Sequence, residues 1–310
     1  MHRLILSSLT CLFFVSLVSA QSAPSGGALA SKAEMVSEVK TLAAGGTFTV
    51  ALKLEHPAGW HSYYKNSGGM EQSLTIQWVL PEGFTAGPIQ WPVPEVKDGF
   101  FGKSFVHSGA PVFLVDLKAP ADLASGKSVT LTANATWQIC EESCMNEEKS
   151  FALTLSSGPA MEKDPAVAAL FEKARANQPQ SAAGWKFSAL SEGGDITLRV
   201  TPDKISDLAP VDFIPNQPFV LPASAGGSIE KDGADWRITL KRAVKDALEA
   251  DIPQGKSFSG ILTGPRAIAV PDTMISAPGA AGTTGASPKP ATADPQRVQK
   301  APEPGVLCRH

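Results

Sequence analysis

Hydrophobic and polar residues alternate along several short stretches of this chain, and glycine, proline or asparagine residues separate these stretches. Such alternation is typical of half-buried antiparallel strands. In the first half of the chain it predicts strands at residues 47–54, 74–80, 111–117, 128–137 and 149–155. Many short strands at this spacing favour a β-sandwich. We therefore expect an all-β first domain over residues 33–157.

A helical pattern interrupts the strands after this domain. Asp164 and Pro165 precede apolar residues at helical spacing, and the pattern stops before Pro179. These features predict one short helix within a connector of residues 158–183. Strand-like runs then return at residues 185–190, 195–201, 235–240, 248–252 and 257–263. They predict a second, smaller β-domain over residues 184–271, so the expected fold class is all-β with two β-sandwich domains.

The two ends of the chain differ from these domains in composition. A short basic start, an apolar run and small residues at Val18 and Ala20 form the pattern of a secretory signal peptide over residues 1–20, cleaved after Ala20. From residue 272 onward the chain is rich in Gly, Ala, Thr and Pro and poor in large apolar residues, which predicts a disordered tail over residues 272–310. We therefore expect an exported, periplasmic protein.

The charge balance argues against nucleic acid as a partner. The chain has 27 Lys and Arg against 30 Asp and Glu, a formal net charge of −3. Loss of Arg3 with the signal peptide removes one positive charge and makes the net charge −4. A slightly acidic protein has no general attraction for nucleic acid or for an acidic membrane surface.

Four cysteines are present, and only Cys140 and Cys144 lie inside a predicted domain, four residues apart after the strand that ends in Trp137. Three intervening residues can bring the two Cα atoms within disulfide distance. Such a disulfide is either a structural staple or an electron-exchanging pair. A loop this small stabilises a fold by only about 2 kcal/mol, whereas exposed disulfides are the labile, catalytic ones. This favours the redox interpretation.

The surroundings of the pair refine this chemistry. Glu141 and Glu142 in the loop raise the pKa of a thiol by like-charge repulsion, which fits an electron donor better than an oxidant that stabilises its thiolate. Zinc usually takes four ligands, and no second Cys/His cluster accompanies the pair, so no metal or other cofactor is expected.

Two aromatic segments precede the cysteines. Residues 59–65 (GWHSYYK) contain both tyrosines of the chain, and residues 98–104 (DGFFGKS) place two phenylalanines between glycines. From composition alone, both segments fit ordinary core residues and a hairpin tip as well as they fit a site.

In this order, the two segments and the cysteine pair resemble the N-terminal periplasmic domain of the DsbD family of thiol:disulfide interchange reductases. That family has a Gly-aromatic-x-x-Tyr-x-Lys segment and an Asp-x-Phe-aromatic-Gly-Lys-Ser cap loop, similar to residues 59–65 and 98–104. Residues 81–84 (PEGF) and 91–94 (WPVP) are similar to the subgroup related to suppressor-of-copper-sensitivity proteins. The resemblance covers residues 33–157 well and the second β-domain more loosely.

The resemblance implies an immunoglobulin-like first domain that takes electrons from a membrane-embedded donor through a thioredoxin-like domain. Its acceptors in the family are thioredoxin-fold periplasmic proteins, such as disulfide isomerases and cytochrome c maturation proteins. Carried over to this chain, Cys144 is the attacking thiol and Cys140 the resolving thiol. His61 and Tyr63 line the active-site pocket. The cap loop comprises Asp98, Phe100, Phe101 and Gly102, and Phe100 with Phe101 shields the pair until a partner docks.

The chain departs from the family in three ways. Three residues separate the cysteines where the best-known members have five, and Gly99 stands where an acidic residue is common. No membrane or terminal thioredoxin segment follows, so we expect a separate membrane-embedded donor or a truncated product. A non-enzymatic exported binding module with a structural Cys140–Cys144 disulfide is the alternative. A copper chaperone is disfavoured because the Met and His residues do not cluster.

Overall fold

A computed structural model describes residues 30–99, 102–192, 194–203, 209–243 and 255–277. The predicted signal peptide, Phe100 and Phe101, most of the predicted tail and the predicted strand at 248–252 lie outside the described residues. Within them, no helix is long and apolar enough to cross a membrane.

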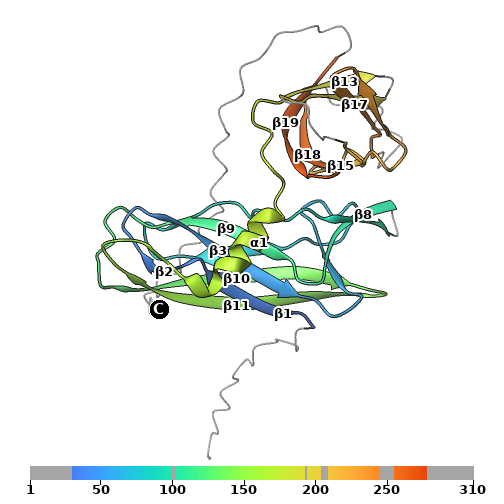
Figure 1. Ribbon diagram of the computed structural model, residues 1–310. Coiled ribbons are helices and arrows are strands. Elements are labelled where there is room, and N and C mark those ends of the chain that lie inside the picture. Colours follow the sequence, from blue (N-terminus) through green and yellow to red (C-terminus); the bar gives the residue numbers. More distant parts are fainter. Residues whose placement is uncertain (1–29, 100–101, 193, 204–208, 244–254, 278–310) are drawn as a thin grey trace, which may run out of the picture.

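The first domain consists of two β-sheets packed face to face (Figure 1). Its strands are β1 (Lys32–Ser37), β2 (Val39–Leu42), β3 (Thr47–Glu55), β4 (His61–Tyr63), β5 (Thr75–Val79), β6 (Thr85–Ala86), β7 (Glu95–Gly99), β8 (Gly102–Ser108), β9 (Val112–Lys118), β10 (Ser128–Cys140), β11 (Cys144–Ser157) and β12 (Glu162–Lys163). One sheet has the order β1-β3-β9-β6, and the other has the order β12-β2-β11-β10-β4-β8-β7, with β5 also paired to β10.

The alternation read in the sequence explains why these strands bury one face. In β10, every second residue from Val129 to Ile139 is buried in the core between the sheets. β10 pairs with β11 along its whole length, from Ser128 opposite Ser156 to Cys140 opposite Cys144. This long hairpin carries the cysteine pair to one end of the sandwich.

The predicted connector helix is present as the 3-10 turn η1 (Pro165–Val167) followed by α1 (Ala168–Ala176). The Asp164 carboxylate caps its start by accepting a hydrogen bond from the Ala166 amide at 3.0 Å. Phe171 and Ala174 are buried in an apolar cluster with residues of β3 and β9, so the helix is attached to the first domain.

The second domain is also all-β. Its strands are β13 (Lys186–Glu192), β14 (Asp195–Thr201), β15 (Asp212–Pro215), β16 (Ser228–Asp232), β17 (Asp235–Leu240), β18 (Ser257–Thr263) and β19 (Ile268–Ser276). They form the path β15-β18-β19-β13-β14-β17-β16, which curls around its own apolar core (Figure 1). The predicted fold class, two β-sandwich domains joined by a short helix, is confirmed.

The second domain extends further along the chain than the sequence suggested. β19 continues to Ser276, although the sequence placed the start of a disordered tail at residue 272. Thr273 and Ile275 are buried, and Thr273 lies opposite Phe258 of β18. β19 also contributes Ile268 and Val270 to the core, so the second domain includes the whole strand from Ile268 to Ser276.

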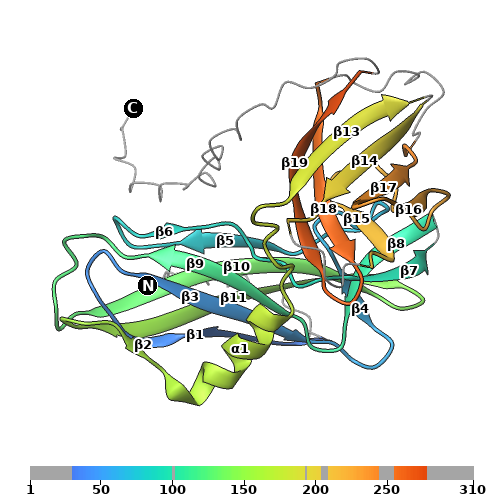
Figure 2. The same cartoon turned by 45° about the horizontal axis from the view of Figure 1, so that its top comes forward.

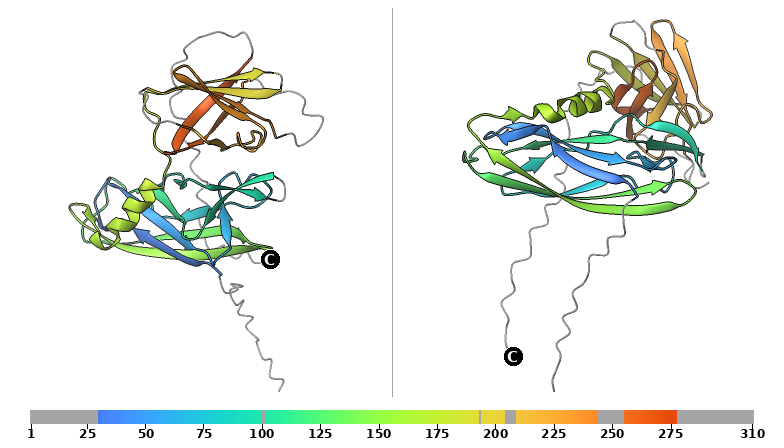
Figure 3. Two further views of the ribbon diagram at one scale, coloured as in Figure 1. Left: turned by 45° about the vertical axis from the view of Figure 1, so that its right-hand side comes forward. Right: turned by 60° about the horizontal axis from the view of Figure 1, so that its bottom comes forward.

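The two domains form separate units in space (Figure 3). The second stands at the end of the first that carries β4, β7 and β8, with β15 and β18 nearest to them (Figure 2). A mixed apolar cluster joins the domains at this point; its buried members are Tyr64, Phe105, Ile214 and Ile261.

Candidate functional site

Cys140 and Cys144 form a disulfide with an S–S distance of 1.99 Å and a Cα–Cα distance of 4.1 Å. The sequence analysis placed the pair in a loop after a strand ending at Trp137, and this was wrong. β10 runs on to Cys140 and β11 begins at Cys144, because the buried alternation continues through Ile139. Only residues 141–143 form the turn, in which the Glu141 amide donates to the Ser143 carbonyl at 3.1 Å.

The two cysteines have different environments. Cys140 is 3% exposed and packs in a small cluster with Tyr63 and Val106. Cys144 is exposed, as is the neighbouring Met145. Thiol–disulfide exchange needs access to one sulfur along the S–S axis. An incoming thiolate or disulfide can therefore reach Cys144 from solvent, whereas Cys140 is covered by the first domain.

The pocket residues predicted from the sequence lie beside Cys140 because of the register of β4. This strand pairs with β10 so that His61 lies opposite Cys140, and with β8 so that Tyr63 lies opposite Val106. Since side chains alternate along a strand, His61 and Tyr63 share the face of Cys140 while Ser62 points to the core. The His61 and Tyr63 rings contact edge to face, with centroids 5.4 Å apart.

The covered face is poorly solvated, which shifts both titratable side chains. Burial, aided by the Glu71 carboxylate, raises the pKa of Tyr63 to about 12, so its hydroxyl stays protonated. Burial and the nearby Lys97 ammonium lower the pKa of His61, against the opposing effects of Gly59 and of the Glu95 and Glu71 carboxylates. His61 Nδ1 is buried and has no hydrogen-bond partner among the described residues. A neutral imidazole with a free nitrogen therefore lies across from Cys140.

The structure places only part of the predicted cap loop. Asp98 is near the end of β7, and its exposed carboxylate accepts from Lys103 Nζ at 2.7 Å. Gly102 begins β8 with a φ of +123° and lies opposite Gly99. In this arrangement of the hairpin, a Cβ at Gly99 would collide with the Ser104 hydroxyl.

A buried hydrogen-bonded chain behind the cysteines was not predicted from the sequence. The Glu147 carboxylate accepts from Trp137 Nε1 at 2.6 Å and from the Ser31 amide at 3.0 Å. Ser31 Oγ bonds His56 Nδ1, and His56 Nε2 bonds Ser62 Oγ, each at 2.9 Å. This series of hydrogen bonds links the start of the first domain to the β10–β11 hairpin and to β4.

Glu147 is the unusual member of this hydrogen-bonded network, because it is a charged residue at an inward position of β11. The register of the hairpin places it opposite Trp137. Burial lowers the pKa of His56 to about 4, outweighing the Glu147 carboxylate, which raises it. His56 is therefore neutral at pH 7 and joins two hydroxyls as one donor and one acceptor.

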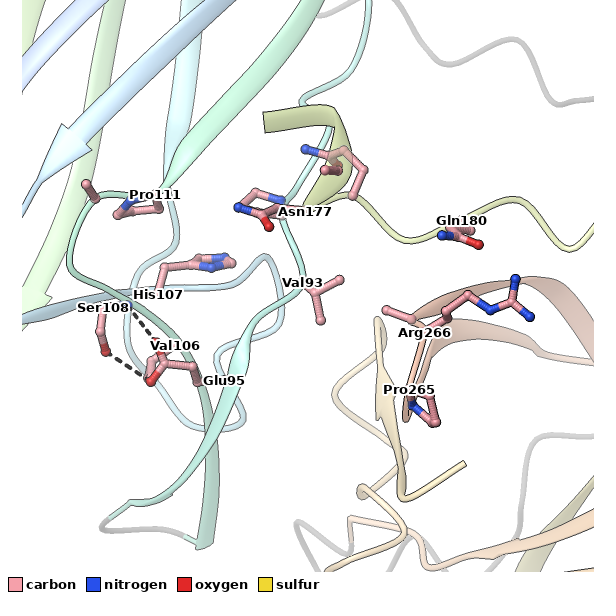
Figure 4. Close-up of a pocket in the computed structure, with 15 residues that line it drawn as sticks. Val93, Glu95, Val106, His107, Ser108, Pro111, Asn177, Gln180, Pro265 and Arg266 are labelled. Atoms are coloured by element: carbon pink, nitrogen blue, oxygen red, sulfur yellow. Dashed lines mark hydrogen bonds between the residues drawn. The ribbon is translucent and has the colours of Figure 1, made fainter. Parts of the chain in front are cut away.

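A separate cavity of about 450 Å³ lies between the domains (Figure 4). Its walls include Val93, His107, Asn177, Gln180, Pro265 and Arg266. Neither cysteine lines this cavity, although Val106, which packs with Cys140, is one of its lining residues. Among the described residues, no group of three or more His, Cys, Asp or Glu is placed to hold a metal ion.

The disulfide lies at the end of a hairpin in a two-layer β-domain, with one covered and one exposed cysteine, and this arrangement gives the access to one sulfur that thiol–disulfide exchange needs. Residues 30–156 match the family model described as the N-terminal domain of the thiol:disulfide interchange protein DsbD. This match confirms, for this part of the chain, the resemblance found in the motifs.

Solved structures extend the likeness to the fold of both domains. The N-terminal periplasmic domain of ScsB from Proteus mirabilis is similar with a TM-score of 0.57 and 16% identity, covering 78% of this chain and 92% of that chain. The match to a Porphyromonas gingivalis W83 protein of unknown function covers 79% of this chain and 98% of that chain at 12% identity. Its TM-score of 0.22 is too low to indicate a shared fold. Among curated proteins, no sequence matches the chain.

Proposed function

We propose that this protein is a periplasmic thiol–disulfide exchange module that passes electrons through Cys140 and Cys144 to thioredoxin-fold acceptors. The observation that carries the proposal is the unequal exposure of the two sulfurs within a DsbD N-terminal domain. The periplasmic location is supported by the export signal expected at residues 1–20 and by the periplasmic origin of the similar ScsB domain.

The exposed sulfur starts the exchange. The Cys144 thiolate attacks one sulfur of the acceptor disulfide, a mixed disulfide forms, and the other acceptor sulfur leaves as a thiolate that takes up a proton. Cys140 then loses its proton and attacks Cys144 Sγ. This re-forms the Cys140–Cys144 bond and releases the second acceptor sulfur as a thiolate. The acceptor gains two electrons, and a separate membrane-embedded dithiol donor returns this protein to its reduced form.

We assign supporting roles to the residues around Cys140. Tyr63 packs against Cys140 and covers the resolving sulfur with a neutral phenol ring. His61 lies opposite Cys140 and supplies a neutral wall of the pocket. Asp98 and Gly102 shape the hairpin that carries Val106 over the sulfur. Disulfide isomerases and cytochrome c maturation proteins are the candidate acceptors.

Trapping of the mixed disulfide tests the proposal. In Cys140→Ser no resolving thiol remains, so incubation of the full chain with an oxidised thioredoxin-fold disulfide isomerase is expected to accumulate a covalent complex. Cys144→Ser is the matched control. Both variants also carry Cys308→Ser, so the thiol left after residue 20 in the control is Cys140, which is covered, and little complex is expected. Non-reducing electrophoresis separates the outcomes. Equal trapping by both variants, or trapping by neither, contradicts the proposed relay.

A permanent staple in a non-enzymatic binding module is the second candidate, because the disulfide joins the last residue pair of the β10–β11 hairpin. A staple there would prevent fraying of two long strands. If the disulfide is a staple, it should resist mild reductant. The double variant Cys140→Ser, Cys144→Ser should then lose stability and keep its activity. Rapid reduction of the disulfide in the folded protein would exclude it.

A further inference from the structure

The strand beside Cys140 also touches the second domain. Tyr63 and Tyr64 are consecutive, so their side chains leave the chain in opposite directions. Tyr63 packs with Val106 and Cys140. Tyr64 is 2% exposed and packs with Phe105 and with residues of β15 and β18 in the second domain. One short segment therefore connects the resolving sulfur to the neighbouring domain.

Hydrogen bonds reinforce this contact. The Tyr64 hydroxyl donates to Asn216 Oδ1 at 2.7 Å. Two residues further on, the buried Asn66 Nδ2 donates to the Pro215 carbonyl at 2.9 Å. Both acceptors follow or end β15, so the segment after β4 is bonded to one edge of the second domain. A buried donor without its acceptor is costly, which makes both bonds specific for this arrangement.

Strand β8 has the same two-sided role. Val106 faces Cys140, and the preceding Phe105 faces the second domain. Phe105 packs with Val96 of β7 and with Ile214 and Ile261 of the second domain. β7 is the edge strand of this sheet and β8 is next to it, so within the described residues no further strand pairs with β7 on its outer side. In Figure 2 the second domain lies directly beside this edge.

On the second-domain side, strand pairing and hydrogen bonds hold Ile214 and Ile261, the two residues that contact the first domain; we call this pair the platform. Ile214 lies opposite Ile261 in the β15–β18 pair. The Asp212 carboxylate accepts from the Phe213 and Ser224 amides at 2.8 and 3.0 Å, which ties the following loop to β15. The contact with the first domain therefore rests on ordered backbone.

The rest of the domain boundary is more open. The connector enters the second domain at Gln180, whose amide donates to the Ala267 carbonyl at 2.8 Å. Between this point and the Tyr64 cluster lies the 450 Å³ cavity, with His107 and Asn177 on one side and Pro265 on the other (Figure 4). Direct side-chain packing between the domains is thus concentrated on the Tyr64 cluster.

We propose that the second β-domain, through Tyr64, Asn66 and Phe105, positions Tyr63 and Val106 over Cys140 and thereby controls how readily the disulfide is opened. This deepens the proposed function, on which its biological meaning rests. When an external thiolate attacks Cys144 Sγ, the S–S bond breaks and Cys140 leaves as a thiolate that later takes up a proton. An apolar cover disfavours that thiolate, and a poorer leaving group slows the reaction.

Variants of the full chain test this positioning. Tyr64→Phe keeps the ring and removes the hydrogen bond to Asn216, and Ile214→Val trims the platform by one methylene. The double variant is expected to be reduced by dithiothreitol about fivefold faster than the parent, the ratio that corresponds to about 1 kcal/mol. Ile238→Val is the matched control: it trims a buried isoleucine of the second-domain core outside the contact cluster, and its reduction rate should not change.

A second measurement, the alkylation rate of Cys140, tests directly how well Tyr63 and Val106 cover this sulfur. In reduced protein that carries both Cys144→Ser and Cys308→Ser, the Cys140 thiol should react with iodoacetamide about fivefold faster when Tyr64→Phe and Ile214→Val are added. Parental rates of both reduction and alkylation in the double variant overturn the proposal, as does equal acceleration by Ile238→Val. These measurements need no protein acceptor, so failure of the relay (no complex trapped by Cys140→Ser) is distinguishable from failure of the positioning.

Discussion

At the scale of single residues, the sulfur environments follow from one register. Cys140 is the last residue of β10 and still has a neighbouring strand, β4, on its other side. Cys144 begins β11, which at this end pairs with β10 and with no second strand among the described residues. Two cysteines four residues apart thus acquire different accessibility because only one lies between two strands.

Glu147 gives a prediction at this scale. Its carboxylate is 4% exposed and accepts from Trp137 Nε1 and from the Ala30 and Ser31 amides. Glu147→Gln places an amide NH2 where an acceptor is needed, which leaves a buried donor unpaired. We expect a loss of about 2 kcal/mol in the free energy of unfolding, measured by urea titration. Glu148→Gln, one residue along and exposed, should cost almost nothing; equal losses in both variants contradict this role.

The motif residues show how far sequence reasoning reaches at this scale. His61 and Tyr63 were expected near the cysteines because of a family resemblance, and the β4 register does bring them to the face of Cys140. The Glu147–Ser31–His56–Ser62 chain was not expected. Its members come from three separate parts of the sequence, near residues 31, 56–62 and 147, and no local pattern links them.

At the scale of elements, α1 depends on an ion pair for its orientation. Arg175 Nη1 and Nη2 donate to the two carboxylate oxygens of Glu38 at 2.9 and 2.7 Å. The Arg175 guanidinium holds the pKa of Glu38 below its usual range. The associated stability is present above the unfolded pKa and is lost as the pH falls through the lower folded pKa.

Lysine cannot reproduce this two-point contact. Arg175→Lys should therefore lower the free energy of unfolding of the first domain by about 1 kcal/mol at pH 7. The difference should shrink once Glu38 is protonated in acid. Urea unfolding at pH 7 and below pH 4 measures both effects. Lys173→Arg, an exposed change on the same helix, is the control, and an identical cost for it would argue against the Glu38 contact.

Strands were predicted correctly where the alternation of apolar and polar residues continued over six or seven residues. The sequence placed strands at 195–201, 235–240 and 257–263, which match β14, β17 and β18. Short strands such as β4 and β15 left no such signal, because three or four residues cannot show a period. These two strands nevertheless carry the site and the domain contact.

At the scale of the whole molecule, buried histidines make stability depend on pH. Burial lowers the pKa of His107 to about 3 and that of His56 to about 4, from an ordinary value of 6.5. Below pH 6.5 the unfolded chain binds protons that the folded chain does not, so stability falls as the pH decreases. At about 1.4 kcal/mol per pKa unit, the two groups cost on the order of 4 kcal/mol at pH 5 relative to pH 7.5.

Urea unfolding at both pH values measures this loss. In His107→Gln one of the two groups no longer titrates, so the difference between pH 7.5 and pH 5 should fall to about half. Comparison of each variant with itself at two pH values removes the intrinsic cost of the substitution. A full-sized pH difference in His107→Gln would show that His107 is not one of the groups responsible.

The amino-acid sequence by itself determined the all-β class, the connector helix and the presence of one close cysteine pair. These features depend on neighbours within a few residues, where side-chain alternation and spacing act directly. Tertiary structure alone decided that Cys140 is covered and Cys144 exposed, that His61 lies opposite Cys140, and that Tyr64 joins the second domain. These depend on which distant strands pair and in what register, and that is set by burial of the whole core rather than by any local stretch.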